Sequence, residues 1–176
     1  MQTLLGGLPR AFPLPMAVVL HRYREADDLL PAVLQRYSAL PLIEAVDKEL
    51  IRSGHVYIAP ADYHLLVEPP CFSLSTDEPV FYARPSIDVL FESAAEVYGK
   101  RTIGVILTGG SQDGAGGAAE IQRRGGRVIV QDPATAESPT MPAAALAATG
   151  TPFVLPLDQI AATLIQMIES ITLEKQ

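Results

Sequence analysis

Short apolar runs alternate with longer amphipathic segments along most of this 176-residue chain. Continuous apolar runs are typical of strands buried on both faces of a parallel sheet, and apolar spacings of three and four are typical of helices. Strands are predicted at 17–20, 42–45, 56–59, 63–67, 103–107, 127–130 and 153–155. Helices are predicted at 27–37, 86–98, 142–148 and 158–171, with another from the glycine-rich loop to 124. The alternation predicts an α/β fold: a doubly wound, Rossmann-like, mostly parallel sheet with helices on both faces.

The first few residues predict the end of a helix without its beginning. Residues 2–5 have helical character, and Gly6, Gly7 and Pro9 stop them. Farther along, Ser86 follows Pro85 directly and is suited to cap the helix that begins there.

Composition narrows the classes of function. The net charge of −7 and the pI of about 4.9 argue against non-specific binding to nucleic acid, whose phosphates require basic patches. Cys71 is the single cysteine, so an internal disulfide is excluded and a reducing compartment fits. Neither a signal peptide nor a membrane-spanning run is recognisable. We therefore expect one cytoplasmic domain over residues 1–176, without membrane insertion.

Two residues of catalytic type follow predicted strands. His21 ends the strand at 17–20, and Asp113 lies in the loop after the strand at 103–107. The carboxyl ends of parallel strands form the active-site edge of such sheets, and a histidine oriented by a carboxylate is the base half of a hydrolytic triad. The glycine-rich loop 109–117 fits a tight turn or a phosphate cradle equally well, but it is not a Walker A loop. The residues that follow the predicted strands do not identify a nucleophile.

Five segments in order resemble one family. Residues 107–115 read Leu-Thr-Gly-Gly-Ser-Gln-Asp-Gly-Ala, which resembles the Leu-Thr-Gly-Met-Gly-x-Asp-Gly-Ala segment of CheB-type protein-glutamate methylesterases. The other four segments are Val-Val-Leu-His-Arg at 18–22, Gly-His-Val-Tyr-Ile-Ala-Pro with His-Leu-Leu-Val at 54–67, Arg-Pro-Ser-Ile-Asp-Val-Leu-Phe at 84–91, and Met-Pro-Ala-Ala-Ala at 141–145. The resemblance spans nearly the whole chain.

This resemblance implies hydrolysis of glutamyl methyl esters on the cytoplasmic helices of methyl-accepting chemotaxis receptors, and deamidation of some glutamines. It implies a Ser-His-Asp triad in which His21 is the base and Asp113 orients it, with the backbone amide of Gly110 at the oxyanion site. It implies no cofactor and no metal. Gly110 and Ser111 replace the Met-Gly of the family's loop.

The family's serine lies in Gly-Ala-Ser-x-Gly-Gly, just before the first helix, and this chain begins partway along that helix. The serine and the first strand are therefore expected upstream of Met1, and the family's receiver domain is absent from these residues. Without its first strand the sheet would expose two strand edges. We expect a chain that is unstable, rearranged, or joined into a homo-oligomer through the gap.

Other interpretations remain open. Ser111, Ser86, Ser138 and Cys71 are weaker candidates for the nucleophile. His55 and His64 are expected to be structural, because their spacing does not suit a metal site. The alternative function is a non-catalytic, CheB-like signalling or binding module, and a weaker one is a nucleotide-binding domain.

Overall fold

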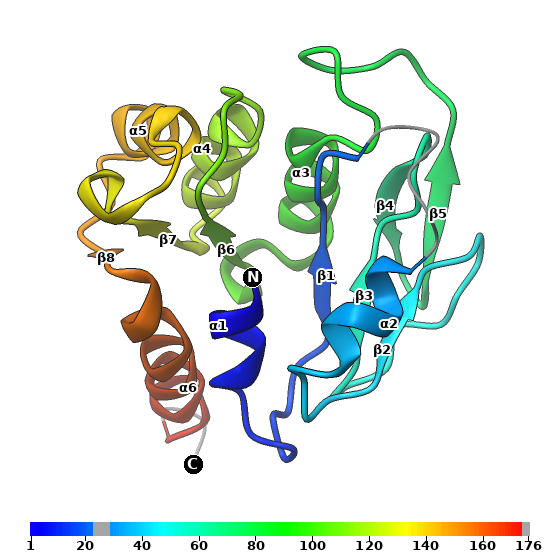
Figure 1. Ribbon diagram of the computed structural model, residues 1–176, viewed down its shortest axis with the longest axis horizontal. Coiled ribbons are helices and arrows are strands. Elements are labelled where there is room, and N and C mark those ends of the chain that lie inside the picture. The colour runs from blue at the N-terminus through cyan, green and yellow to red at the C-terminus, as the bar shows by residue number, and fades with distance from the viewer. Residues whose placement is uncertain (23–28, 174–176) are drawn as a thin grey trace.

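Two separate parallel sheets form the centre of the molecule, which the computed structural model describes over residues 1–22 and 29–173. The first sheet has the order β1 (Met16–Val18), β3 (Val56–Ile58) and β2 (Leu42–Glu44). The second has the order β6 (Ile103–Ile106), β7 (Arg127–Gln131) and β8 (Val154–Leu155). β4 (His64–Glu68) and β5 (Cys71–Ser75) form an antiparallel hairpin beside the first sheet (Figure 1).

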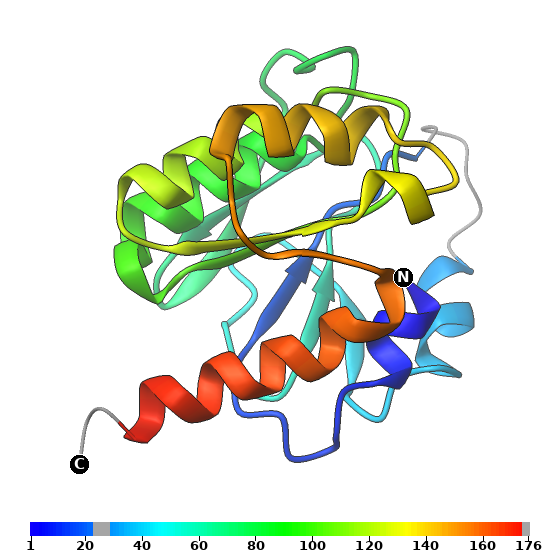
Figure 2. The same ribbon diagram turned by 90° about the vertical axis from the view of Figure 1, so that its left-hand side faces the viewer.

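Helices cover both faces of the strands. α1 (Gln2–Gly6), α2 (Leu30–Gln35) and α6 (Leu157–Leu173) lie on one side, and α3 (Ile87–Tyr98), α4 (Ala115–Arg123) and α5 (Thr140–Thr149) lie on the other (Figure 2). Two short 3-10 helices follow α3 and β7, at Gly99–Arg101 and Pro133–Thr135. This arrangement confirms the predicted doubly wound α/β fold.

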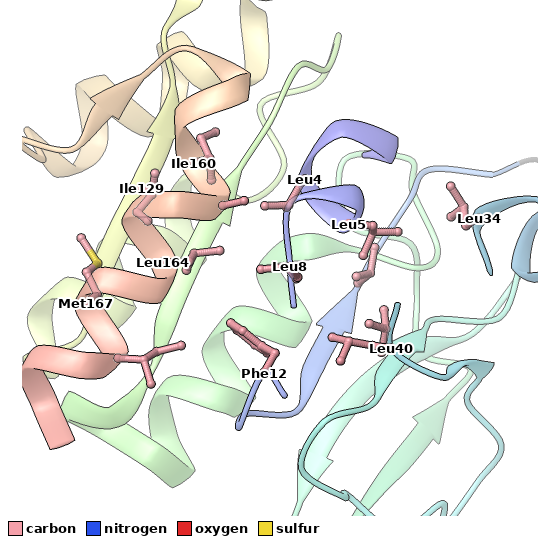
Figure 3. Packing of buried hydrophobic residues seen from close by; sticks show 14 of the residues in the cluster. Leu4, Leu5, Leu8, Phe12, Leu34, Leu40, Ile129, Ile160, Leu164 and Met167 are labelled. Atoms are coloured by element: carbon pink, nitrogen blue, oxygen red, sulfur yellow. The ribbon is translucent and has the colours of Figure 1, made fainter. Parts of the chain in front are cut away.

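The side chains of each strand alternate between the apolar cores on the two faces of the sheets, as strand geometry requires. Val56 and Ile58 of β3 face the core that α1 and α6 cover, whereas Tyr57 faces the core between α3 and the β4–β5 hairpin. In the first core, Leu4 and Leu8 lie across from Ile160 and Leu164 of α6 (Figure 3). α1 therefore packs against the last helix of the chain.

A gap separates the two sheets. β1 is the outer strand of one sheet and β6 the outer strand of the other, and no described strand pairs with either on the side that faces the gap. A cavity of about 770 Å³ lies between them, lined largely by apolar side chains such as Val18 of β1 and Val105 of β6. The sheet is thus interrupted at the place where the first strand was expected.

Most predicted elements are present, with ends that shift by one to three residues. Ser86 caps α3 as predicted, and Pro31 lies in the first turn of α2, where a proline is tolerated. Part of the helix predicted at 27–37 lies outside the described residues, and its described part begins at Leu30. None of the helices within the described ranges is long and apolar enough to cross a membrane.

Candidate active site

His21 and Asp113 are in direct contact. His21 follows β1 and Asp113 lies in the loop between β6 and α4, and the Nε2 atom of His21 is 2.7 Å from Oδ2 of Asp113. The histidine side chain keeps 30% of its surface exposed, whereas that of the aspartate is fully buried. The structure thus joins, across 92 positions of sequence, the two side chains that the strand-end pattern predicted.

Asp113 lies at the amino end of α3. Its Oδ2 accepts a hydrogen bond from the backbone N–H of Ile87 at 2.7 Å, and its Oδ1 accepts one from that of Asp88 at 3.0 Å. The hydroxyl of Ser86 donates to Oδ1 at 2.7 Å. Burial by itself raises the pKa of Asp113, but the hydrogen bonds from His21 and from the start of α3 outweigh it, so the pKa is lowered. The carboxylate therefore stays ionised at neutral pH and holds His21 in one orientation.

A second histidine, His64, holds the backbone of Ser86 in place. His64 of β4 is 1% exposed, and its Nδ1 accepts a hydrogen bond from the N–H of Ser86 at 3.2 Å. Its Nε2 lies 3.2 Å from the carbonyl oxygen of Glu78. His64 is therefore structural, as predicted, and it positions the serine that contacts Asp113. The sequence did not reveal this connection, because the three residues come from three separate segments.

Metal binding finds no support in the part of the chain that the structure describes. It contains no group of three His, Cys, Asp or Glu side chains that could hold a metal ion. His55 is bonded through Nδ1 to the carbonyl oxygen of Ser53 at 2.9 Å, which fits the structural role predicted for it.

Gly110 lies at the carboxyl end of the gap between the two sheets. His21 from one sheet and Gly109 and Gly110 from the other line the same cavity. Hydrogen bonds of 3.0 and 2.9 Å to the backbone of Ser138 and Met141 hold Gly109 in place, whereas Gly110 is exposed. The position suits the predicted oxyanion role of Gly110, which remains a prediction.

Three of the four candidate nucleophiles, Ser111, Ser86 and Cys71, use their side chains in hydrogen bonds to other groups. The hydroxyl of Ser111 accepts the N–H of Asp113 at 3.1 Å, and that of Ser86 donates to Asp113. Cys71 lies in the β4–β5 hairpin, where its thiol donates to the carbonyl of Glu68. Within residues 1–22 and 29–173, no serine, threonine or cysteine is hydrogen-bonded to His21. The described hydrogen bonds of His21 therefore include no nucleophile.

Two charged residues near the start of α3 have partners that are distant in sequence. Arg84 and Asp88 have the four-residue spacing of a cap or an ion pair, but Arg84 pairs with Asp62 at 2.7 Å. Asp88 instead accepts the N–H of Gly117 at 2.6 Å, which joins α3 to α4, and burial raises its pKa. The four-residue spacing did not predict these contacts, because Asp62 and Gly117 are distant in sequence from Arg84 and Asp88.

Basic residues beside His21, such as Arg22 and Arg24, would suit the rim of the site mouth or a solvated surface, yet the side chain of Arg22 is only 6% exposed. Its Nη1 donates to Glu44 at 2.9 Å, and its Nη2 has no partner among the described residues. Arg24, the other arginine placed at that rim, lies outside the described residues.

A second pocket, of about 430 Å³, also adjoins His21. Arg22, Asp62 and Arg84 line it, together with the exposed turn at Phe81 and Tyr82. The connection from β5 to α3, which carries this turn, arches over the carboxyl end of β1 (Figure 1). The pocket was not predictable from the sequence, because residues 80–83 contain none of the usual turn residues.

Comparison with known proteins identifies relatives of this chain. The family model for CheB methylesterase matches residues 1–164. A putative protein-glutamate methylesterase/protein-glutamine glutaminase of Leptospira interrogans is 46% identical over 168 residues, which cover 95% of this chain and 87% of that protein. The protein-glutamate methylesterase FrzG of Myxococcus xanthus is 42% identical over 94% of this chain, but the match covers only 50% of that protein.

The fold has a close counterpart among solved structures. The crystal structure of the Thermotoga maritima CheB methylesterase catalytic domain superposes with a TM-score of 0.89 at 35% sequence identity. The superposition covers 94% of this chain and 90% of that one. Sequence and structure agree, and the chain belongs to the CheB methylesterase family.

Proposed function

We propose that this protein acts in hydrolysis of glutamyl methyl esters, and in deamidation of glutamines, on the cytoplasmic helices of chemotaxis receptors. One observation carries the proposal: a half-exposed histidine is held by a buried, ionised aspartate at the carboxyl edge of the sheet. That pair is the base and orienting group of an acyl-transfer site. The proposed setting is the cytoplasm, and the mechanism uses neither metal nor cofactor.

In the proposed reaction, His21 takes the proton of a serine hydroxyl as the oxygen attacks the ester carbonyl. Since Nε2 faces Asp113, Nδ1 is the ring nitrogen that receives the proton. The negative oxygen of the tetrahedral intermediate accepts a hydrogen bond from the Gly110 amide. The carbon–oxygen bond to the methoxy group then breaks, and His21 returns the proton to release methanol. Water, activated by His21 in the same way, cleaves the acyl-serine to glutamate and free serine.

The serine is proposed to lie in a segment that precedes Met1 and fills the gap between β1 and β6. Met1 lines the gap cavity together with His21 and Gly110. A strand in the gap, parallel to its neighbours, would end at this edge and continue directly into α1, as a right-handed crossover requires. Its last residues would then lie between the base and the oxyanion donor.

The alternative is a non-catalytic module that binds receptor helices or another signalling protein. It is favoured by the observation that no described nucleophile contacts His21. The two functions differ in whether the ester is turned over.

Methanol release from methylated receptor fragments by the full-length gene product separates these alternatives. The enzyme hypothesis expects release that His21→Ala lowers by at least about a thousandfold. The nucleotide sequence upstream of the Met1 codon should also encode Gly-x-Ser-x-Gly-Gly in frame. Release that survives His21→Ala would refute the role of His21, and binding without release would establish the module.

A further inference from the structure

The amino ends of α3 and α4, two helices that lie side by side, are joined by two carboxylates (Figure 1). Asp113, which Gly114 separates from α4, accepts the backbone N–H groups of Ile87 and Asp88 in the first turn of α3. In the other direction, Oδ1 of Asp88 accepts the N–H of Gly117 in the first turn of α4, at 2.6 Å. Asp88 is therefore bonded to the segment around Asp113 twice, through its own N–H and through its side chain.

Glycines allow the two helix ends to approach each other closely. A Cβ at Gly117 would lie 2.6 Å from Cβ of Phe91 and 3.0 Å from the carbonyl oxygen of Asp88. Gly114 has a φ of +95°, and a Cβ there would lie 2.8 Å from the side chain of Ile87. The amino end of a helix attracts anions, and at α4 this place is taken by the carboxylate of Asp88. The glycine-rich loop thus binds a buried side chain of the protein itself.

Asp88 is a buried carboxylic acid to which the proposed reaction assigns no step. The residue is 7% exposed. Burial raises the pKa of its carboxyl group, and the backbone N–H groups of Gly117, Gly114 and Gly116 offset part of that rise. Carboxylates are rarely buried unless their oxygens are satisfied, so the contact with α4 accounts for the presence of Asp88 inside the protein.

The contact between Asp88 and α4 determines where Asp113 lies. One residue separates Asp113 from the first turn of α4, so a displacement of that turn moves the carboxylate of Asp113 as well. Oδ2 of this carboxylate lies 2.7 Å from Nε2 of His21, and hydrogen bonds weaken steeply as their distance and angle change. A chain of contacts therefore leads from Asp88 through Gly117 and Asp113 to His21.

We propose that Asp88 is a positioning residue of the active site. By accepting the N–H of Gly117 it fixes the start of α4, and with it the carboxylate that orients His21. The role requires an acceptor oxygen at this place rather than a negative charge, because without one the N–H of Gly117 would be buried and unpaired. The effect on turnover rests on the proposed function, whereas the bond between His21 and Asp113 is observable without turnover.

The ring N–H signals of nitrogen-labelled histidine in NMR spectra of the 176-residue protein test this positioning. The proton between His21 and the buried carboxylate of Asp113 should exchange slowly with water and give a signal that His21→Gln removes. Asp88→Ala should abolish this signal, or speed the exchange of its proton with water by about tenfold or more, because the carboxylate is no longer held in place.

His64 is the internal control in the same spectrum. It is 1% exposed, and its Nε2 lies 3.2 Å from the carbonyl oxygen of Glu78. It contacts the start of α3 through Ser86 and not through α4. The ring N–H signal of His64 should therefore persist in Asp88→Ala, whereas a general loosening of the structure would weaken it as well.

Two further variants separate the acceptor from the charge and from its helix. Asp88→Asn keeps an oxygen that can accept the N–H of Gly117, so it should retain the His21 signal. Glu92→Ala removes an exposed carboxylate one turn farther along α3, and it should leave the His21 and His64 signals unchanged.

A His21 signal that survives in Asp88→Ala, or that is missing from the unaltered protein, would overturn the proposal. Equal loss of the His21 and His64 signals in the folded variant would also overturn it. If Asp88→Ala does not fold, Asp88→Asn decides, because loss of the His21 signal from that folded variant contradicts the need for an acceptor alone.

Kinetics of the full-length gene product provide the second measurement. Asp88→Ala should lower kcat about tenfold or more with little change in KM, and Asp88→Asn should restore most of it, since only the geometry of the base is affected. If the unaltered product releases no methanol, the proposed function fails. The NMR spectra would still decide whether Asp88 positions His21.

Discussion

The hydroxyl of Ser86 donates to Oδ1 of Asp113 at 2.7 Å, on the carboxylate oxygen opposite the one that contacts His21. The same hydroxyl accepts the N–H of Val89 and so caps α3. One side chain therefore both begins a helix and fixes the orienting aspartate, which links the stability of α3 to the geometry of the active site.

We expect Ser86→Ala to lose about 1 kcal/mol of unfolding free energy, the usual cost of a lost cap. In the full-length gene product it should also lower kcat about tenfold with little change in KM, because Asp113 loses one of the bonds that orient it. Denaturation curves and methanol-release kinetics check the two effects. Ser170→Ala on the exposed side of α6 is the control. A loss of stability with kcat unchanged would contradict the positioning role of Ser86.

Asp113 should make stability depend on pH. Its folded-state pKa is lowered, so it contributes stability that is present above the unfolded pKa of about 3.9 and is lost as pH falls through the folded pKa. Asp113→Asn should cost about 2 kcal/mol at pH 7, since charged hydrogen bonds are lost. In urea denaturation between pH 7 and about pH 4, the free energy of unfolding of Asp113→Asn should differ from that of the unaltered protein by a constant amount. Below about pH 4 this difference should shrink. A difference that is unchanged at pH 3 would contradict the lowered pKa of Asp113.

The sequence predicted those parts of the fold and site that depend on local patterns. Buried strands appear as apolar runs, and His21 and Asp113 were brought together by the rule that parallel strands end at one edge. The support behind the pair was not predictable, because His64 and Ser86 meet only after the β4–β5 hairpin folds against α3. The turn at Phe81 and Tyr82 escaped prediction because positive φ angles are unusual for bulky residues.

The open edges of β1 and β6 should govern association of the 176-residue chain. Unpaired strand edges and an apolar cavity favour pairing with a second copy. We expect size-exclusion chromatography with light scattering to show concentration-dependent homo-oligomers. Val105→Lys, which places a charge in the gap, should shift the population toward monomer. A stable monomer at all concentrations would contradict association through the gap.

Two substitutions at Gly110 distinguish a role of its backbone N–H from a requirement for the small size of glycine. A Cβ at Gly110 would meet only the Ser138 hydroxyl, at 3.6 Å, and the residue does not need positive φ. Gly110→Ala in the full-length gene product should therefore lower kcat only slightly, because the N–H remains. Gly110→Pro removes that N–H and should lower kcat by about a hundredfold or more, the usual effect of deleting an oxyanion donor.

The neighbouring glycine is the contrasting case. A Cβ at Gly109 would lie 2.6 Å from Met141, so Gly109→Ala should disturb the loop and reduce both stability and kcat. Circular dichroism separates misfolding from a lost hydrogen bond in each variant. If Gly110→Pro folds normally and retains full methanol release, the oxyanion donor is another group, and the Gly110 amide has no part in the reaction.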